Sequence, residues 1–139
     1  MAKPGRIKGP KPDRGQRIAA VEPTNYENNP PMFSLERVQA GDYCFSAKAQ
    51  EHKAMFGEAI YRRRALSWKE IKNIDRHGLG FEKIARASIT APIPKFINDD
   101  VDHFLAFRFN GKRPMVGYRS RDIFYVLWFD WNFSLYDHG

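Results

Sequence analysis

The run from Ile123 to Phe129 constrains the fold more than any other segment, because all seven of its residues are apolar or aromatic. A run of this length bounded by polar turns is typical of a strand, whose successive side chains point to opposite faces of the sheet. Apolar residues on both faces predict a central strand that is covered on both sides. We expect one face to carry Ile123, Tyr125, Leu127 and Phe129, and the other to carry Phe124, Val126 and Trp128.

A hairpin is predicted immediately before this strand. Phe104 to Phe109 and Lys112 to Arg119 are its two strands, and the dipeptide Asn110-Gly111 between them is typical of a type I′ turn with two positive φ angles. Pro114 has no backbone N–H, so we expect it at a sheet edge or beside a bulge. After a turn at residues 130–132, Phe133 to Tyr136 is predicted to form a short last strand.

The earlier part of the chain is expected to contain one strand and two helices. Phe33, Leu35 and Val38 alternate with polar neighbours, which predicts a short strand. Apolar residues at helical spacing predict a helix from an N-cap at Ser46 to about Leu66. Arg62, Arg63 and Arg64 in its last turn are interpreted as a solvated face.

A second helix should follow at once. Ser67 and Glu70 have the spacing of a capping box. The segment from His77 to Pro94 contains two glycines and two prolines and is therefore predicted to be extended and irregular. The predicted fold is α+β: a short N-terminal strand, two consecutive helices, then a C-terminal antiparallel β-meander of three to four strands.

Charge is concentrated at the N-terminus. The 139 residues carry a net charge of +7, and residues 1–17 hold six cations against one acid. Prolines and glycines oppose regular structure there, so residues 1–31 are predicted to be a flexible basic arm and linker ahead of a single domain at residues 32–139. Such an arm suits phosphate backbones, or it acts only as a solubilising tail. Its basic residues are Lys3, Arg6, Lys8, Lys11, Arg14 and Arg17.

Several protein classes find no support in this sequence. The single cysteine, Cys44, cannot form an internal disulfide, and the chain has neither a run of eighteen apolar residues nor an apolar leader. We therefore expect a cytoplasmic protein that does not bind membranes. Phosphate-binding glycine loops and common zinc motifs are missing, so we expect no cofactor and no metal.

Basic and aromatic residues gather toward the C-terminus. On neighbouring strands of a meander, cations can form a groove for phosphates, although each one also serves to keep a sheet edge from aggregating. Trp131 and Phe133 lie in a predicted turn and are proposed as exposed anchors for a partner. The residues proposed to bind nucleic acid are Arg108, Lys112, Arg113, Tyr118 and Arg121.

The order of elements and the basic C-terminal strands resemble the RelE/ParE superfamily of bacterial toxins, over about Phe33 to His138. Ribonuclease members of that superfamily cut messenger RNA on the ribosome. The resemblance implies that Arg108, Arg113 and Arg119 contact RNA in the catalytic site, that Tyr136 or His138 transfers a proton, and that an antitoxin neutralises the protein. The stretch from Phe124 to Tyr136 is also similar to the ends of small bacterial and phage proteins.

Metal-independent RNA cleavage is chemically reasonable with these groups. His138 or Tyr136 would act as the acid and Glu82 or His77 as the base. His138 is otherwise a frayed terminal residue, and the glycines beside His77 otherwise only end a helix. The alternative function is a non-enzymatic phage or plasmid protein that binds and inhibits a host protein or nucleoprotein complex. Plain nucleic-acid binding through the arm is the third hypothesis.

Overall fold

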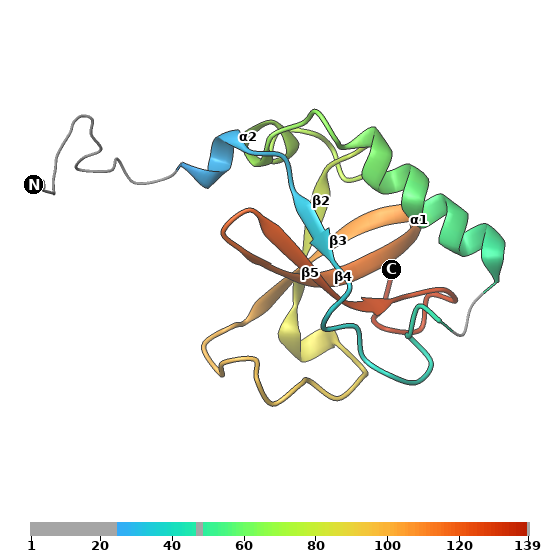
Figure 1. Cartoon of the computed structure of the whole chain (residues 1–139). Helices are drawn as coiled ribbons and strands as arrows, with labels where there is room; N and C mark the ends of the chain where they lie inside the picture. Colours follow the sequence, from blue (N-terminus) through green and yellow to red (C-terminus); the bar gives the residue numbers. More distant parts are fainter. Residues whose placement is uncertain (1–24, 47–48, 139) are drawn as a thin grey trace, which may run out of the picture.

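The computed structural model describes residues 25–46 and 49–138, which form a five-stranded mixed sheet with two α-helices (Figure 1). The order of strands across the sheet is β1-β5-β4-β3-β2. The α+β class is confirmed, but the number and order of the strands differ from the prediction. The elements in chain order are η1 (Tyr26–Asn28), β1 (Met32–Ser34), α1 (Gln50–Arg62), α2 (Trp68–Ile71), β2 (Phe81–Ala85), η2 (Arg86–Ser88), β3 (His103–Asn110), β4 (Arg113–Ser120) and β5 (Ile123–Phe129).

Strands β2 to β5 form an antiparallel meander, and β1 pairs parallel to β5. β5 therefore lies between β1 and β4, as its two apolar faces predicted. The register of the parallel pair places Met32 opposite Ile123 and Phe33 opposite Phe124. The first strand is thus shorter than the alternation of Phe33, Leu35 and Val38 suggested.

Two predictions about strands were wrong. The segment predicted to be irregular contains β2, in which Phe81 pairs with Phe107 of β3. The local sequence of β2 does not indicate a strand, and the pairing with β3 places it in the sheet. Conversely, the predicted strand from Phe133 to Tyr136 is not a strand. There the side chain of Asp130 accepts backbone N–H bonds that a neighbouring strand would otherwise have to accept.

A β-bulge breaks the predicted alternation along β5. Val116 pairs with Trp128 and Gly117 with Val126, so Leu127 is an extra residue without a partner on β4. As a result Leu127 and Trp128 pack in the same apolar cluster, instead of on opposite faces as predicted. Gly117 permits the close approach, because a Cβ there would lie 1.9 Å from the carbonyl oxygen of Tyr125.

The β3–β4 hairpin is where the sequence placed it, but its turn differs in type. The loop consists of Gly111 and Lys112, and Asn110 is the last residue of β3. Of these three residues only Gly111 has a positive φ, at 58°, which fits a type II′ turn and not type I′. Pro114 lies next to a register shift in β3, which confirms the alternative of a bulge.

The helices agree with the prediction in number but not in their ends. α1 begins after Ala49, which caps it without a side-chain hydrogen bond, so Ser46 is not its N-cap. α1 ends at Arg62, before the predicted end at Leu66. The capping box of α2 is confirmed, because Ser67 Oγ accepts from the Glu70 N–H and Glu70 Oε1 accepts from the Ser67 N–H. Among the described residues, no helix is long and apolar enough to cross a membrane.

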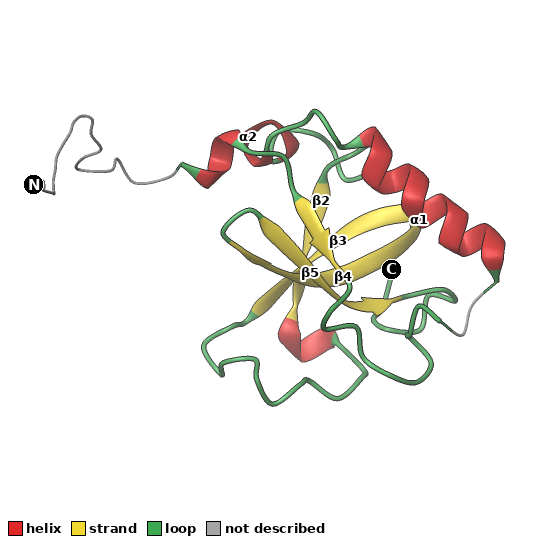
Figure 2. Ribbon diagram, viewed as in Figure 1, coloured by secondary structure: helices red, strands yellow, loops and turns green. Residues whose placement is uncertain are grey.

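Each face of the sheet is covered by different parts of the chain (Figure 2). α1 and α2 contribute Phe56, Ala59 and Trp68 to the cluster on one face. The other face is covered by the connection between β2 and β3, with Ile97 buried, and by the C-terminal Leu135 and Tyr136. We call these the helical face and the loop face. The ordered C-terminal segment on the loop face is what positions the candidate site.

Candidate functional site

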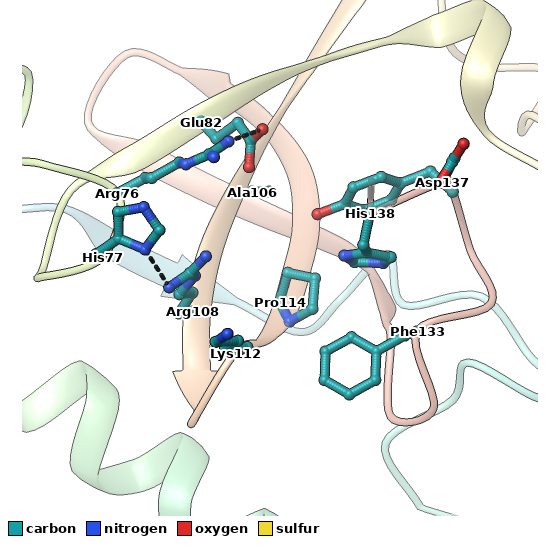
Figure 3. Close-up of a pocket in the computed structure, with 11 residues that line it drawn as sticks. Arg76, His77, Glu82, Ala106, Arg108, Lys112, Pro114, Phe133, Asp137 and His138 are labelled. Carbon is teal, nitrogen blue, oxygen red and sulfur yellow. Dashed lines mark hydrogen bonds and ion pairs between the residues drawn. The ribbon is translucent and has the colours of Figure 1, made fainter.

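A pocket of about 390 Å³ lies on the loop face beside the β3–β4 hairpin (Figure 3). Four parts of the chain form it: the loop before β2, β2 itself, the hairpin, and the C-terminal segment. Sequence reasoning had proposed most of its polar residues separately, and the fold brings them together. The pocket is lined by Arg76, His77, Glu82, Ala106, Arg108, Lys112, Pro114, Phe133, Tyr136, Asp137 and His138.

One side of the pocket is built on two side-chain contacts. Arg108 Nη1 donates to Nδ1 of His77 at 2.8 Å, and Arg76 is paired with Glu82 at 2.5 Å. Because a guanidinium only donates, this bond makes Nδ1 of His77 an acceptor and leaves the ring proton on Nε2. The backbone N–H of His77 also donates to Asp75 Oδ1 at 2.8 Å, which orders the loop. His77 is thus oriented with Nδ1 toward the guanidinium of Arg108.

The opposite side is built on a buried carboxylate. His138 Nε2 lies 2.8 Å from Oδ2 of Asp130, whose side chain is completely buried. Oδ1 of Asp130 accepts from the backbone N–H groups of Ser134 and Leu135, which fixes the turn after β5. Figure 3 shows His138 across the pocket from His77, with Arg108 and Pro114 between them. Asp130 therefore sets the orientation of His138 as well as the path of the chain.

Tyr136 stacks on His138, with ring centroids 4.0 Å apart. Burial raises the pKa of the Tyr136 phenol well above its ordinary value, and the negative charges of Glu82 and Asp130 raise it further, against the opposing effect of Arg108 and Arg76. The phenol therefore remains protonated at neutral pH. It can donate a hydrogen bond to an anion in the pocket.

Arg63 supports this site from the helical face. Although it was interpreted as solvated, it is 1% exposed and donates to three carbonyl oxygens, those of Ala59, Leu79 and Arg108. These bonds connect the end of α1, the loop after His77 and strand β3. Burial, with a smaller effect from Arg62, lowers the pKa of Arg63 to about 10, so it remains charged at neutral pH.

Arg119, proposed as catalytic, does not line the pocket. It pairs with Glu27 at 2.5 Å, and its guanidinium carbon lies 4.2 Å from the ring centroid of Trp68 on the helical face. The reason is the alternation along β4, which points residue 119 to the face opposite Pro114. The implied role of Arg119 in the site is therefore not supported by its position.

Tyr118 and Arg121 also lie away from the pocket. Tyr118 stacks on Tyr125 with centroids 5.1 Å apart, and it follows the pocket residue Pro114 by four residues, or roughly 13 Å along the strand. Arg121 lies in the β4–β5 turn, where its carbonyl oxygen accepts from Arg119. The cations of the meander are thus divided between its two ends.

The remaining proposed residues lie near the pocket or outside the described part of the chain. Arg113 donates through Nε to the carbonyl oxygen of Trp131. Trp131 is only 6% exposed and packs on Phe109 and Phe129, so it is not an exposed anchor, whereas Phe133 is 41% exposed. The arm residues lie outside the described residues: Lys3, Arg6, Lys8, Lys11, Arg14 and Arg17.

Sequence reasoning missed two contributors, Arg76 and Asp130. Arg76 precedes His77 directly and could have been found as its neighbour. Asp130 was interpreted only as a turn residue, and a spacing of eight residues from His138 corresponds to no regular element. Among the described residues, no group of three or more His, Cys, Asp or Glu side chains is arranged to hold a metal ion.

Comparison with known proteins gave no relatives. No protein-family model matches the chain, and neither the curated proteins nor the solved structures contain a significant match.

Proposed function

We propose that the pocket binds a phosphodiester of RNA and cleaves it without a metal ion. The observation that carries this proposal is the arrangement of two imidazoles, His77 and His138, on opposite sides of a pocket that contains the cationic side chains of Arg76, Arg108 and Lys112. Cleavage of RNA needs a base, an acid and positive charge at the phosphate, and these groups supply all three.

Arg108 is the central phosphate ligand in this proposal. Its side chain reaches the pocket from β3, while its carbonyl oxygen is bonded to the buried Arg63. A planar guanidinium can donate two hydrogen bonds to a phosphate and keeps its charge at neutral pH. Lys112 in the hairpin turn adds a second positive charge. Arg76 is held by Glu82, so we assign Glu82 to positioning and not to proton transfer.

His77 is assigned as the base. Its Nδ1 accepts from Arg108 in the free protein, and this lone pair becomes available when Arg108 turns to the phosphate. Nδ1 then takes the proton of the ribose 2′-hydroxyl. The 2′ oxygen forms a bond to phosphorus while the bond from phosphorus to the 5′ oxygen breaks.

His138 is assigned as the acid that protonates the departing 5′ oxygen. Asp130 lets His138 carry a positive charge while keeping a partner, since the two side chains already form a pair. Tyr136 donates a hydrogen bond to a non-bridging phosphate oxygen, for which its protonated phenol is suited. The products are a 2′,3′-cyclic phosphate and a 5′-hydroxyl, and no water or redox partner is consumed.

A set of chimeric oligonucleotides tests this function. Each has one ribonucleotide in a 2′-O-methyl background, so only one 2′-hydroxyl can attack, and the assay contains EDTA. We expect mass spectrometry to find the cyclic phosphate and the 5′-hydroxyl, and Arg108→Gln to slow the reaction by about 10²-fold. Arg121→Gln, at the other end of β4, is the matched control and should cleave at the wild-type rate. Absence of cleavage for every ribonucleotide, or equal losses in both variants, would refute the assignment.

A further inference from the structure

Phe133 has an unfavourable backbone conformation at the edge of the pocket. Its φ is 61°, and among the described residues other than glycine only Arg121 shares a positive φ. For a residue with a Cβ this conformation is unfavourable and persists only where the surroundings impose it. At the same time Phe133 is 41% exposed and lines the pocket.

The surroundings of Phe133 account for this conformation. The next two backbone N–H groups, of Ser134 and Leu135, are bound by Asp130. Ser134 Oγ is also 3.0 Å from the Tyr43 hydroxyl, and the Ser134 carbonyl oxygen accepts from Thr90 at 3.0 Å. The turn is therefore held from several directions, and the strained residue presents a large apolar side chain to solvent instead of to the core.

The ring of Phe133 is also oriented by its neighbours. The guanidinium carbon of Arg113 lies 5.6 Å from the ring centroid, and His138 meets the ring edge to face at 5.2 Å. Arg113 itself is anchored on the carbonyl oxygen of Trp131. Arg113 lies over one face of the ring, and Phe133 nevertheless remains 41% exposed where it lines the pocket. Figure 3 shows this ring next to His138 and on the same side of Arg108 as Pro114.

We propose that Phe133 stacks on a nucleobase next to the phosphate bound by Arg108, and so makes the site selective for single-stranded RNA. This inference rests on the proposed function and adds the structural class of its substrate. Bases in a duplex are already stacked and paired, whereas an unpaired base can turn outward onto an aromatic ring. A ring stacks on any base, so the contact selects for strandedness more than for sequence.

A matched pair of probes tests the stacking directly. One is a 2′-O-methyl hexanucleotide, which cannot be cleaved, and the other has the same phosphates but abasic sugars at its central positions. At fixed salt, we expect Phe133→Ala to weaken binding of the intact probe about ten-fold and to leave binding of the abasic probe unchanged. Phe133→Trp should bind the intact probe within about two-fold of the wild-type affinity. Fluorescence anisotropy measures each dissociation constant.

A second truncation separates stacking from damage to the turn. Phe133→Gly removes the ring but accepts a φ of 61° readily, so it should lose the same ten-fold affinity while melting at a higher temperature than Phe133→Ala. Equal losses for the two probes, or no loss for either, would overturn the stacking proposal. Cleavage of the chimeric RNA without this base-dependent difference leaves the proposed function standing and refutes only the stacking. Base-dependent binding without any cleavage refutes the catalytic proposal and retains the stacking site.

Discussion

Within residues 25–46 and 49–138, two His–Asp pairs have the same contact distance and very different surroundings. His138 and Asp130 are 2.8 Å apart beside the pocket, and His103 and Asp102 are 2.8 Å apart at the start of β3. The Asp130 side chain is completely buried, whereas the Asp102 side chain is 85% exposed. The distance between the partners therefore does not distinguish a candidate catalytic pair from an ordinary surface contact.

The difference between the pairs lies in what surrounds each carboxylate. Asp130 accepts two backbone N–H bonds in addition to its contact with His138, so both of its oxygens have partners in a site without water access. Asp102 is solvated, and its attraction to His103 competes with bulk water and salt. Of the two pairs, only the buried one holds its imidazole in a fixed orientation.

The largest expected effect is on the rate of RNA cleavage, which should depend on His138 and not on His103. We expect His138→Gln to reduce the rate of RNA cleavage by about 10²- to 10⁴-fold, because it removes the proposed proton donor. His103→Gln is the matched control and should keep the wild-type rate. Single-turnover rates on the chimeric oligonucleotide measure both. A similar decrease in the two variants would show that the buried pair has no special role.

The next effect distinguishes the two carboxylates by stability. Asp130→Ala leaves the N–H groups of Ser134 and Leu135 without their acceptor, so we expect a loss of about 3 kcal/mol in the free energy of unfolding. Asp102→Ala should change that free energy by less than about 0.5 kcal/mol. Urea denaturation followed by tryptophan fluorescence gives both values. Equal stabilities would mean that the turn after β5 does not depend on Asp130.

A smaller effect on stability is expected from Tyr136, which stacks on His138 of the buried pair and has no counterpart beside the exposed pair. Its pKa is raised in the folded state, so folded Tyr136 keeps its proton while unfolded tyrosine loses it above a pKa near 10. The contribution of Tyr136 to the free energy of unfolding is therefore fully present below pH 10. Above pH 10 this contribution declines by about 1.4 kcal/mol per pH unit. Arg63 acts in the opposite direction, because its lowered pKa makes the folded state more stable as the pH rises above about 10.

Comparison of variants isolates the contribution of Tyr136. The decline between pH 10 and 11 should be smaller in Tyr136→Phe than in the wild type, because the effect of Arg63 is common to both proteins. Tyr61→Phe, at a residue that is 57% exposed, should behave as the wild type. Urea denaturation at each pH measures the slopes, and identical slopes in all three proteins would contradict the raised pKa.

Residue types in the sequence identified many of the side chains in the pocket, but they did not show which of the proposed residues would meet there. His77, Glu82, Arg108, Lys112 and His138 were all proposed from the sequence, and the pocket contains all five. Arg119 was proposed with them, and it lies instead on the helical face. Adjacent strand residues point to opposite faces, and the sequence alone does not say which of those faces will carry a pocket.

Local chemistry accounts for the features that could be read directly. The capping box of Ser67 and Glu70 and the hairpin at Gly111 depend on neighbours within a few residues, and the two-sided apolar run of β5 depends only on its own composition. Such features are decided by backbone conformation and hydrogen bonds close along the chain. They were therefore visible before any tertiary contact was known.

Pairing between distant segments decided the rest. β2 became a strand because β3 offered it a partner, and the bulge at Leu127 arose from the register between β4 and β5. The same pairing placed His77 and His138, sixty-one positions apart in the sequence, on opposite sides of one pocket. Contacts of this kind are stabilised by burial across the sheet. A local sequence pattern does not show which distant strand a segment will pair with.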